Sequence, residues 1–349
     1  MSSSGLTVLD YKALPKIELH AHLSGSISRQ CLHEVWLLKK AAGETDLQDP
    51  LIEMPPGKHD YDLKTFFPLF SSYIYNLVND APTLRYTTLS VLRDFAEDGV
   101  VYLELRTTPR AMPAAGLTEA DYVQTILDTI ADFERSPEGK TLRTKLILSV
   151  DRRNTAAQAR HVLALCKQFQ RLGVVGVDLC GNPAVPLDAR RLGPVFEEAR
   201  EVPGLGMTLH FAEAECSGGD AELDALLAWR PDRLGHVICV GERVRREIVS
   251  RKGVGLELCL SCNVHAGMVR GGFESHHFGE WWKVAGAVVV LSTDDVGVFC
   301  SPLSNEYALV AQHFGLSRAD ICGLIRNGLD VIFGGEEEKS RLRDVLWEA

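Results

Sequence analysis

The chain has 349 residues, of which 46% are hydrophobic and 24% are charged, the usual balance of a soluble folded protein. The 37 Lys and Arg residues against 47 Asp and Glu give a net charge of −10, without the basic face that nucleic-acid-binding proteins usually carry. The length suits one α/β barrel with insertions, so we expect a single domain over residues 1–349.

Other features argue against a membrane-spanning or secreted protein. The chain has no run of about 18 apolar residues, and residues 1–5 lack the basic and apolar parts of a secretory signal. Nine cysteines, an odd number scattered along a long chain, are typical of reduced thiols in the cytoplasm. We therefore expect a cytoplasmic monomer that binds neither nucleic acid nor a membrane.

Short runs rich in Val, Leu and Ile recur along the chain, as expected for strands buried on both faces of a parallel sheet. These eight runs occupy residues 16–22, 100–108, 145–151, 174–181, 206–213, 233–240, 254–263 and 287–295. Helical apolar spacing fills the gaps at 118–134, 154–172, 187–201, 220–229, 241–251 and 304–314. Capping-box patterns predict helix starts at Thr118 and Ser317, each followed three residues later by Asp.

Eight strands that alternate with helices predict either a doubly wound sheet or a (β/α)8 TIM barrel. The first strand is not followed by a GxGxxG motif, which argues against the dinucleotide-binding sheet and favours the barrel. The connection over residues 23–99 is far longer than the others. We expect it to be a helical insertion, broken by residues 50–57 into two helical pieces, that builds over the active site.

Side chains that bind metals gather at the ends of the predicted strands. His20 and His22 end the first strand, and their spacing of two directs both imidazoles to the same side. His210 lies near the end of the fifth strand and Asp294 near the end of the eighth. Three imidazoles and a carboxylate suit Zn²⁺, so we predict one zinc ion per chain. A buried His pair satisfied by hydrogen bonds is the alternative that a lone His-x-His would favour.

Four motifs of this chain resemble those of the adenosine deaminase family. They are residues 14–23 (LPKIELHAHL), 208–213 (TLHFAE), 233–236 (RLGH) and 292–295 (STDD), which follow the family's order. Further stretches are similar to the adenosine-deaminase-like branch of N6-methyl-AMP deaminases: residues 102–110, 150–153, 256–263, 276–279 and 297–299. The resemblance implies a TIM barrel with a mononuclear zinc site.

The implied reaction is hydrolytic deamination of a 6-aminopurine nucleotide, from N6-methyl-AMP to IMP and methylamine. Deamination of adenosine or adenine with release of ammonia is the alternative, and a binding protein on an inactive barrel is a third reading. The resemblance implies that Glu213 protonates N1 of the purine. His236 and Asp295 would orient and deprotonate the attacking water, with Asp295 also near N7. The backbone N–H of Gly181 would meet N3, although a glycine there also suits a simple turn.

The resemblance also bears on the choice between nucleoside and nucleotide. Adenosine deaminases carry an Asp that holds the ribose 5′-hydroxyl, and Ser24 stands at that position here. The hydroxyls of Ser24 and Ser26 permit a 5′-phosphate, because they can donate hydrogen bonds to it. Arg106, Thr107 and Arg110, at the end of the second strand, are the candidates for the remaining phosphate contacts. An internal salt bridge, for example with Glu104, is the alternative role of Arg106.

One cysteine pair falls outside these roles. Cys259 and Cys262 form a lone CxxC, which occurs in redox-active and zinc-binding proteins. No second CxxC exists, so we interpret both as buried core thiols.

Overall fold

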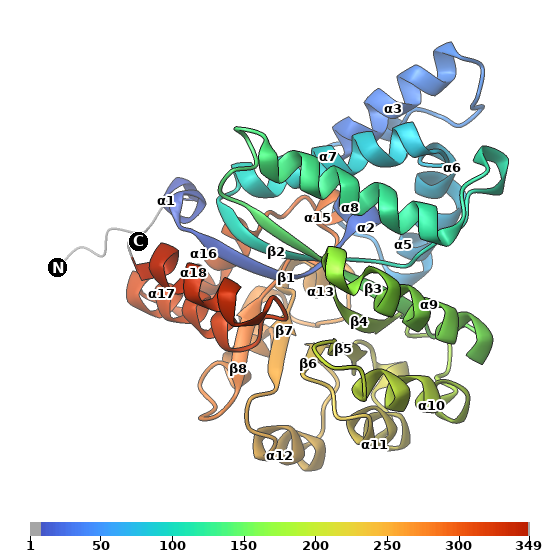
Figure 1. The fold of residues 1–349 in the computed structure, drawn as a ribbon. Helices are drawn as coiled ribbons and strands as arrows, with labels where there is room; N and C mark the ends of the chain where they lie inside the picture. Colours follow the sequence, from blue (N-terminus) through green and yellow to red (C-terminus); the bar gives the residue numbers. More distant parts are fainter. Residues whose placement is uncertain (1–7, 348–349) are drawn as a thin grey trace.

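The structure, a computed structural model, describes residues 8–347, so residues 1–5, which were not expected to form a secretory signal, lie outside the described part. Within that part, eight parallel strands pair in chain order around a nearly closed barrel (Figure 1). The strands are β1 (Lys16–His22), β2 (Val100–Thr107), β3 (Arg143–Asp151), β4 (Val174–Cys180), β5 (Gly206–Phe211), β6 (Arg233–His236), β7 (Gly255–Leu258) and β8 (Val288–Leu291). The predicted (β/α)8 barrel is confirmed.

The last four strands end earlier than the sequence predicts. β5 stops before Ala212 and β6 ends at His236, and both residues have a positive φ (51° and 66°). Asp294, beyond β8, also has a positive φ of 61°. A left-handed backbone cannot continue a strand, and non-glycine residues adopt it at a cost that concentrates at functional sites. The apolar runs therefore continue past the strands as loops that turn into the site.

Helices surround the barrel (Figure 1). Those outside the β1–β2 connection are α1 (Val8–Ala13), α8 (Glu119–Arg135), α9 (Ala156–Phe169), α10 (Ala189–Arg200), α11 (Asp220–Ala228), α12 (Glu242–Ser250), α13 (Leu260–His265), α14 (Phe278–Trp281), α15 (Val296–Phe299), α16 (Leu303–Phe314), α17 (Arg318–Asn327) and α18 (Gly335–Trp347). Single helical turns are η2 (Pro113–Ala115), η3 (Gln170–Leu172), η4 (Glu215–Ser217), η5 (Phe273–Ser275) and η6 (Gly328–Asp330). The capping boxes at Thr118 and Ser317 are both formed, as predicted.

The connection between β1 and β2 is more divided than the two helical pieces predicted. It contains α2 (Leu23–Ser26), α3 (Arg29–Ala41), α4 (Pro50–Glu53), α5 (Leu63–Leu69), η1 (Phe70–Ile74), α6 (Tyr75–Leu77) and α7 (Ala81–Glu97). Asp49, Asp62 and Asp80 each cap the N-terminus of a new helix, since their side chains accept backbone hydrogen bonds there. α7 packs against α8 in the outer ring of helices (Figure 1).

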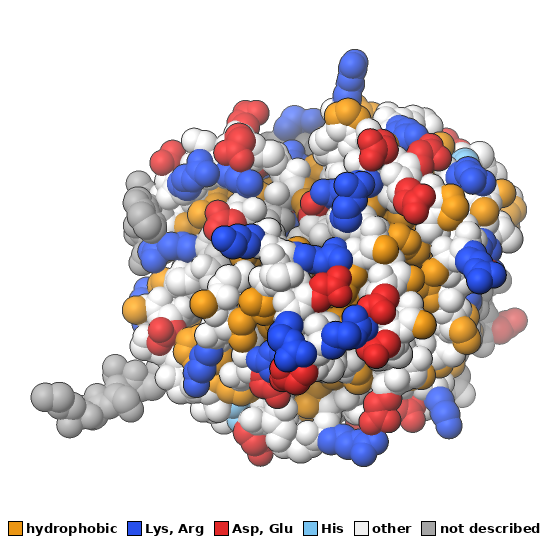
Figure 2. Space-filling model, turned by 90° about the horizontal axis from the view of Figure 1, so that it is seen from below, with side chains coloured by type: hydrophobic (Ala, Val, Ile, Leu, Met, Phe, Trp, Pro, Cys, Tyr) orange, Lys and Arg blue, Asp and Glu red, His pale blue; other side chains and the backbone are white. Residues whose placement is uncertain are grey.

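The surface carries charges of both signs. On the face drawn in Figure 2, Lys and Arg side chains are interspersed with Asp and Glu rather than gathered into one patch. Among the helices of residues 8–347, none is long and apolar enough to cross a membrane.

Candidate metal centre and active site

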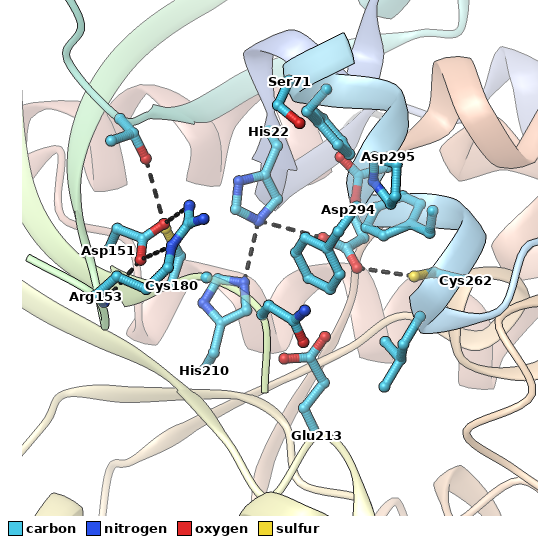
Figure 3. A pocket seen from close by; sticks show the side chains of 18 of the residues that line it. His22, Ser71, Asp151, Arg153, Cys180, His210, Glu213, Cys262, Asp294 and Asp295 are labelled. Atoms are coloured by element: carbon cyan, nitrogen blue, oxygen red, sulfur yellow. Dashed lines mark hydrogen bonds and ion pairs between the residues drawn. The ribbon is translucent and has the colours of Figure 1, made fainter. Parts of the chain in front are cut away.

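A cavity of about 510 Å³ opens at the carboxyl ends of the strands (Figure 3). Its floor comes from strand ends, including Asp151 of β3 and His210 of β5. Its roof comes from the β1–β2 connection, where α5 and η1 contribute Phe66, Phe67 and Phe70. An apolar roof over a polar floor is typical of a site that takes up a flat aromatic molecule and holds its polar edge.

The four predicted ligands lie close together, and three of them, His22, His210 and Asp294, line this cavity. His20, His22, His210 and Asp294 each offer one donor atom, and these atoms lie within 4.8 Å of one another. The Nε2 atoms of His20 and His22 both lie 3.3 Å from Oδ1 of Asp294, and Nε2 of His22 lies 3.1 Å from Nε2 of His210. Within the described residues, the buried Nε2 of His20 has no hydrogen-bond partner. A buried nitrogen aimed at three other donors fits a metal ion.

Buried groups behind two of the imidazoles fix which nitrogen faces the cluster. Nδ1 of His20 lies 2.7 Å from Oε2 of Glu257, and Nδ1 of His210 lies 2.9 Å from the carbonyl oxygen of Leu179 and 3.1 Å from Oδ1 of Asp178. These acceptors take the Nδ1 protons, so both Nε2 lone pairs are free for a metal. Sequence reasoning missed Glu257 and assigned no such role to Asp178, although buried acids on barrel strands were the available signal.

Arg106 corrects a prediction. Its side chain is fully buried inside the barrel, where Nη2 lies 2.9 Å from Oε2 of Glu257 and Nη1 lies 3.4 Å from Oδ1 of Asp178. The predicted phosphate contact is therefore wrong, and the alternative of an internal salt bridge is right. Although burial opposes ionisation, Arg106 and Arg233 hold the pKa of Glu257 well below its ordinary value. Glu104 pairs with Arg233 rather than with Arg106.

The four other predicted phosphate contacts do not line the cavity. The hydroxyl of Thr107 points outward and lies 2.7 Å from the hydroxyl of Tyr122. The guanidinium of Arg110 stacks 4.6 Å from the ring centre of Tyr75, behind the cavity wall. Ser26 is buried and absent from the lining. Ser24 interacts with the hydroxyl of Tyr75, which itself lines the cavity, so Ser24 stands one residue behind the wall.

The three predicted acid–base residues meet beside the cluster. Burial raises the pKa of Glu213 to about 7, against the opposing effect of His210. Nε2 of His236 lies 3.9 Å from both Oε1 of Glu213 and Oδ2 of Asp294. Burial, together with the carboxylates of Asp294 and Glu213, raises the pKa of Asp295 well above its ordinary value. The raised pKa of Glu213 suits it as a proton donor near neutral pH.

Two glycines lie against carboxylates that line the cavity. Gly181 lines it with a φ of 106°, and a Cβ there would lie 2.8 Å from Oδ1 of Asp151. Gly25, which sequence reasoning passed over, packs directly against a catalytic candidate. A Cβ on Gly25 would lie 1.5 Å from Oδ1 of Asp295, so the close approach of α2 fixes the position of that carboxylate.

The lone CxxC is buried, as interpreted from the sequence, and both thiols are free. Cys262 also lines the cavity, and its Sγ lies 2.8 Å from Oδ2 of Asp294 (Figure 3). This thiol thus contacts the free oxygen of a candidate ligand, a contact that the spacing alone did not reveal.

The chain matches a known protein family over nearly its whole length. The family model for adenosine deaminase matches residues 15–349. The chain belongs to the adenosine deaminase family. The resemblance of the four motifs is thereby confirmed, and with it a family whose members are metal-dependent.

Within the adenosine deaminase family, the chain is similar to several N6-methyl-AMP deaminases. Human N6-methyl-AMP deaminase is 33% identical over 341 residues, which cover 95% of this chain and 92% of the human one. The crystal structure of Arabidopsis N6-mAMP deaminase matches with a TM-score of 0.87 and 33% identity, covering 97% of this chain and 99% of its own. Arabidopsis ADAL complexed with IMP matches with a TM-score of 0.88 and 32% identity, covering 97% and 98%.

Proposed function

We propose that this chain is a zinc-dependent hydrolase that converts N6-methyl-AMP and water to IMP and methylamine. The observation that carries the proposal is the meeting, in one cavity, of a four-donor cluster with the buried carboxyl of Glu213. Relatives that are called N6-methyl-AMP deaminases cover nearly the whole chain. A relative that binds IMP has the same fold, which supports a nucleotide with a 6-oxopurine as the product.

The candidate ligands His20, His22, His210 and Asp294 would hold the zinc ion. When bound, a zinc ion supplies a nucleophilic oxygen at neutral pH by lowering the pKa of water. Burial lowers the pKa of His22 to about 3, so this imidazole is neutral and its lone pair is available to a metal.

The other cavity residues handle the purine and the protons. Attack at C6 removes the aromaticity of the ring and places negative charge on N1, and the protonated carboxyl of Glu213 neutralises it. Asp295, which lines the cavity next to the candidate ligand Asp294, accepts the proton of the attacking water. The backbone N–H of Gly181 faces the purine edge at N3. Asp295 then passes its proton to the amine nitrogen as the C–N bond breaks and methylamine leaves C6. The C6 hydroxyl returns a proton to Glu213 as it becomes the carbonyl of the 6-oxopurine.

The phosphate of the substrate requires a cation at the rim of the cavity. Two basic residues line it, Lys64 and Arg153. The guanidinium of Arg153 is already held by Asp151, with Nε 2.8 Å from Oδ1 and Nη2 2.6 Å from Oδ2. Lys64 is exposed and has no ion-pair partner in the part of the chain that the structure describes. Lys64 is therefore the cation that we expect to meet a 5′-phosphate, with Tyr75 in the cavity wall and Ser24 behind it.

The experiment is to incubate the zinc-loaded protein with N6-methyl-AMP and to measure both products by mass spectrometry. Equal amounts of IMP and methylamine are expected from the wild type. The Glu213→Gln variant serves as the matched control for contaminating activity, since its cavity keeps the same shape. Absence of IMP from the zinc-loaded wild type would overturn the proposal.

A further inference from the structure

His236 reaches the reacting centre through Nε2, and its other ring nitrogen is bound inside the protein. Nδ1 of His236 lies 3.0 Å from Nδ2 of Asn263, and both side chains are fully buried. A neutral imidazole has one N–H and one acceptor nitrogen. The partner at Nδ1 therefore decides whether Nε2 donates a hydrogen bond to the reaction or accepts a proton from it.

The backbone N–H of Phe278, at the start of α14, fixes the position of the proton on His276. The N–H of Phe278 lies 3.1 Å from Nδ1 of His276 and can only donate, so that Nδ1 must be the acceptor. Burial, reinforced by His277 and His236, lowers the pKa of His276 well below its ordinary value, so the ring is neutral. Its single proton must then be on Nε2.

That proton fixes the orientation of the Asn263 amide. Nε2 of His276 lies 3.2 Å from Oδ1 of Asn263 and donates to it. The reversed amide would place two donors, Nδ2 of Asn263 and Nε2–H of His276, against each other. The observed orientation leaves Nδ2 of Asn263 facing His236 as a donor, so Nδ1 of His236 accepts and its proton is on Nε2.

We propose that Asn263 and His276 are positioning residues that hold His236 with its proton on Nε2. His236 then donates a hydrogen bond to the attacking water oxygen instead of removing its proton. The ring of His277 supports this position, since its Nε2 lies 2.6 Å from the carbonyl oxygen of His236. This inference rests on the proposed function and refines it, because Asp295 becomes the sole proton acceptor for the water.

The proton on Nε2 of His236 also affects how many metal ions the site can hold. His236, Cys259 and Asp294 form a second group of donor atoms close enough to hold a metal. Nε2 of His236 faces Asp294 at 3.9 Å, but a protonated nitrogen has no lone pair to offer a metal. The hydrogen bonds through Asn263 therefore favour one metal ion per chain over two.

Replacing Asn263 by the isosteric Asp should move the proton of His236 from Nε2 to Nδ1. In Asn263→Asp, the carboxylate accepts from His276 as before, and it also accepts from His236, which moves the His236 proton to Nδ1. We expect kcat to fall on the order of 10²- to 10⁴-fold, the scale of a lost or wrongly protonated catalytic His, while KM and metal content change little. If His236 acted as the base, the new carboxylate would strengthen it, and unchanged or raised kcat would overturn the proposal. Asn79→Asp, in the β1–β2 connection, is the matched control.

His276 allows a second comparison. His276→Gln keeps an amide that can accept from Phe278 and donate to Asn263, whereas His276→Leu removes both functions. We expect the Gln variant to retain more kcat than the Leu variant. Equal losses in two folded, metal-loaded variants would show that the ring only fills space.

NMR of the zinc-loaded protein with ¹⁵N-labelled histidine reads the tautomer directly, without turnover. The signal of His236 is identified by its loss in His236→Gln. We expect the proton on Nε2 in the wild type and on Nδ1 in Asn263→Asp. A wild-type proton on Nδ1 would overturn the inference, even if N6-methyl-AMP is the substrate. Conversely, a protein that fails to turn over N6-methyl-AMP but has the His236 proton on Nε2 would contradict the proposed substrate and leave the proposed tautomer intact.

Discussion

The backbone of Asp294 pairs with β1 at the residues that carry the candidate metal ligands. The N–H of Asp294 donates to the carbonyl oxygen of His20 at 2.7 Å, and its carbonyl oxygen accepts from the N–H of His22 at 2.9 Å. An isolated parallel bridge between Ala21 and Asp294 lies at the same point, between the last and the first strand. The candidate metal ligands therefore lie where the last strand closes the barrel against the first. Bound metal should for this reason stabilise the fold.

Replacing one ligand tests the cluster. His210→Ala removes an imidazole whose Nε2 lies 3.1 Å from that of His22, so we expect metal content to fall well below one ion per chain, with a lower melting temperature. Elemental analysis after gel filtration measures it. His161→Ala, at an exposed histidine that pairs with Glu119, should keep one ion. Two tightly bound ions in the wild type, or unchanged content in His210→Ala, would contradict the assignment.

The protonation of Glu213 sets the alkaline limit of activity. Burial raises its pKa to about 7, and the reaction needs the protonated carboxyl, so kcat should fall as the pH rises through this value. In Glu213→Gln we expect metal content to stay the same and kcat to fall at least ~10²-fold, because an amide cannot supply the proton. Initial rates over a pH series measure the alkaline fall in kcat. Single-turnover kinetics measure the loss in Glu213→Gln. Near-normal kcat in the metal-loaded variant would show that another group protonates N1.

Gly25 should be needed for activity although it carries no side chain. In Gly25→Ala the new Cβ would lie 1.5 Å from Oδ1 of Asp295, so that carboxylate must move. A displacement of about 1 Å at a catalytic group costs on the order of 10²-fold in rate, and we expect a loss of that size in kcat. Gly323→Ala on α17, where a Cβ meets nothing within 4 Å, should leave kcat unchanged. Wild-type kcat in Gly25→Ala would show that Asp295 is not positioned by this contact.

Lys64 should distinguish nucleotide from nucleoside. Two unit charges about 4 Å apart in water interact by roughly 1 kcal/mol, and a phosphate carries a charge of about −2. For Lys64→Gln we expect kcat/KM for N6-methyl-AMP to fall roughly five- to thirtyfold, while that for N6-methyladenosine stays the same. Lys140→Gln, near the amino end of β3 and so at the opposite end of the barrel, is the control. Equal losses for the two substrates would place the phosphate elsewhere.

The sequence predicts those parts of the site that depend on short spacing. His20 and His22 face the same side because a strand repeats every two residues, and Asp294 follows a strand that is recognisable from its Val and Leu residues. The partners of these ligands could not be predicted in this way. Glu257 meets His20 across 237 residues, and the pattern of β2 does not show whether Arg106 points into the cavity or into the barrel.

Backbone conformation and long-range hydrogen bonds account for a second group of features that the sequence does not predict. The loop after β6 is aimed into the site by positive φ angles at His236 and Val237, and apolar pattern alone predicts a continued strand there. The role of Asn263 follows from its hydrogen bonds to His236 and His276, which span 27 and 13 residues, so neither helical nor strand spacing reveals them.

The most direct test of the proposed function is a comparison of kcat/KM on the zinc-loaded wild type for N6-methyl-AMP, AMP, adenosine and adenine. All four carry an amine at C6, so the cavity chemistry is held constant while the phosphate, the ribose and the methyl group vary. We predict that N6-methyl-AMP is the best of the four and that IMP and methylamine form in equal amounts. A higher kcat/KM for adenosine or adenine would contradict the nucleotide assignment, and no turnover of any of the four would contradict the deaminase itself.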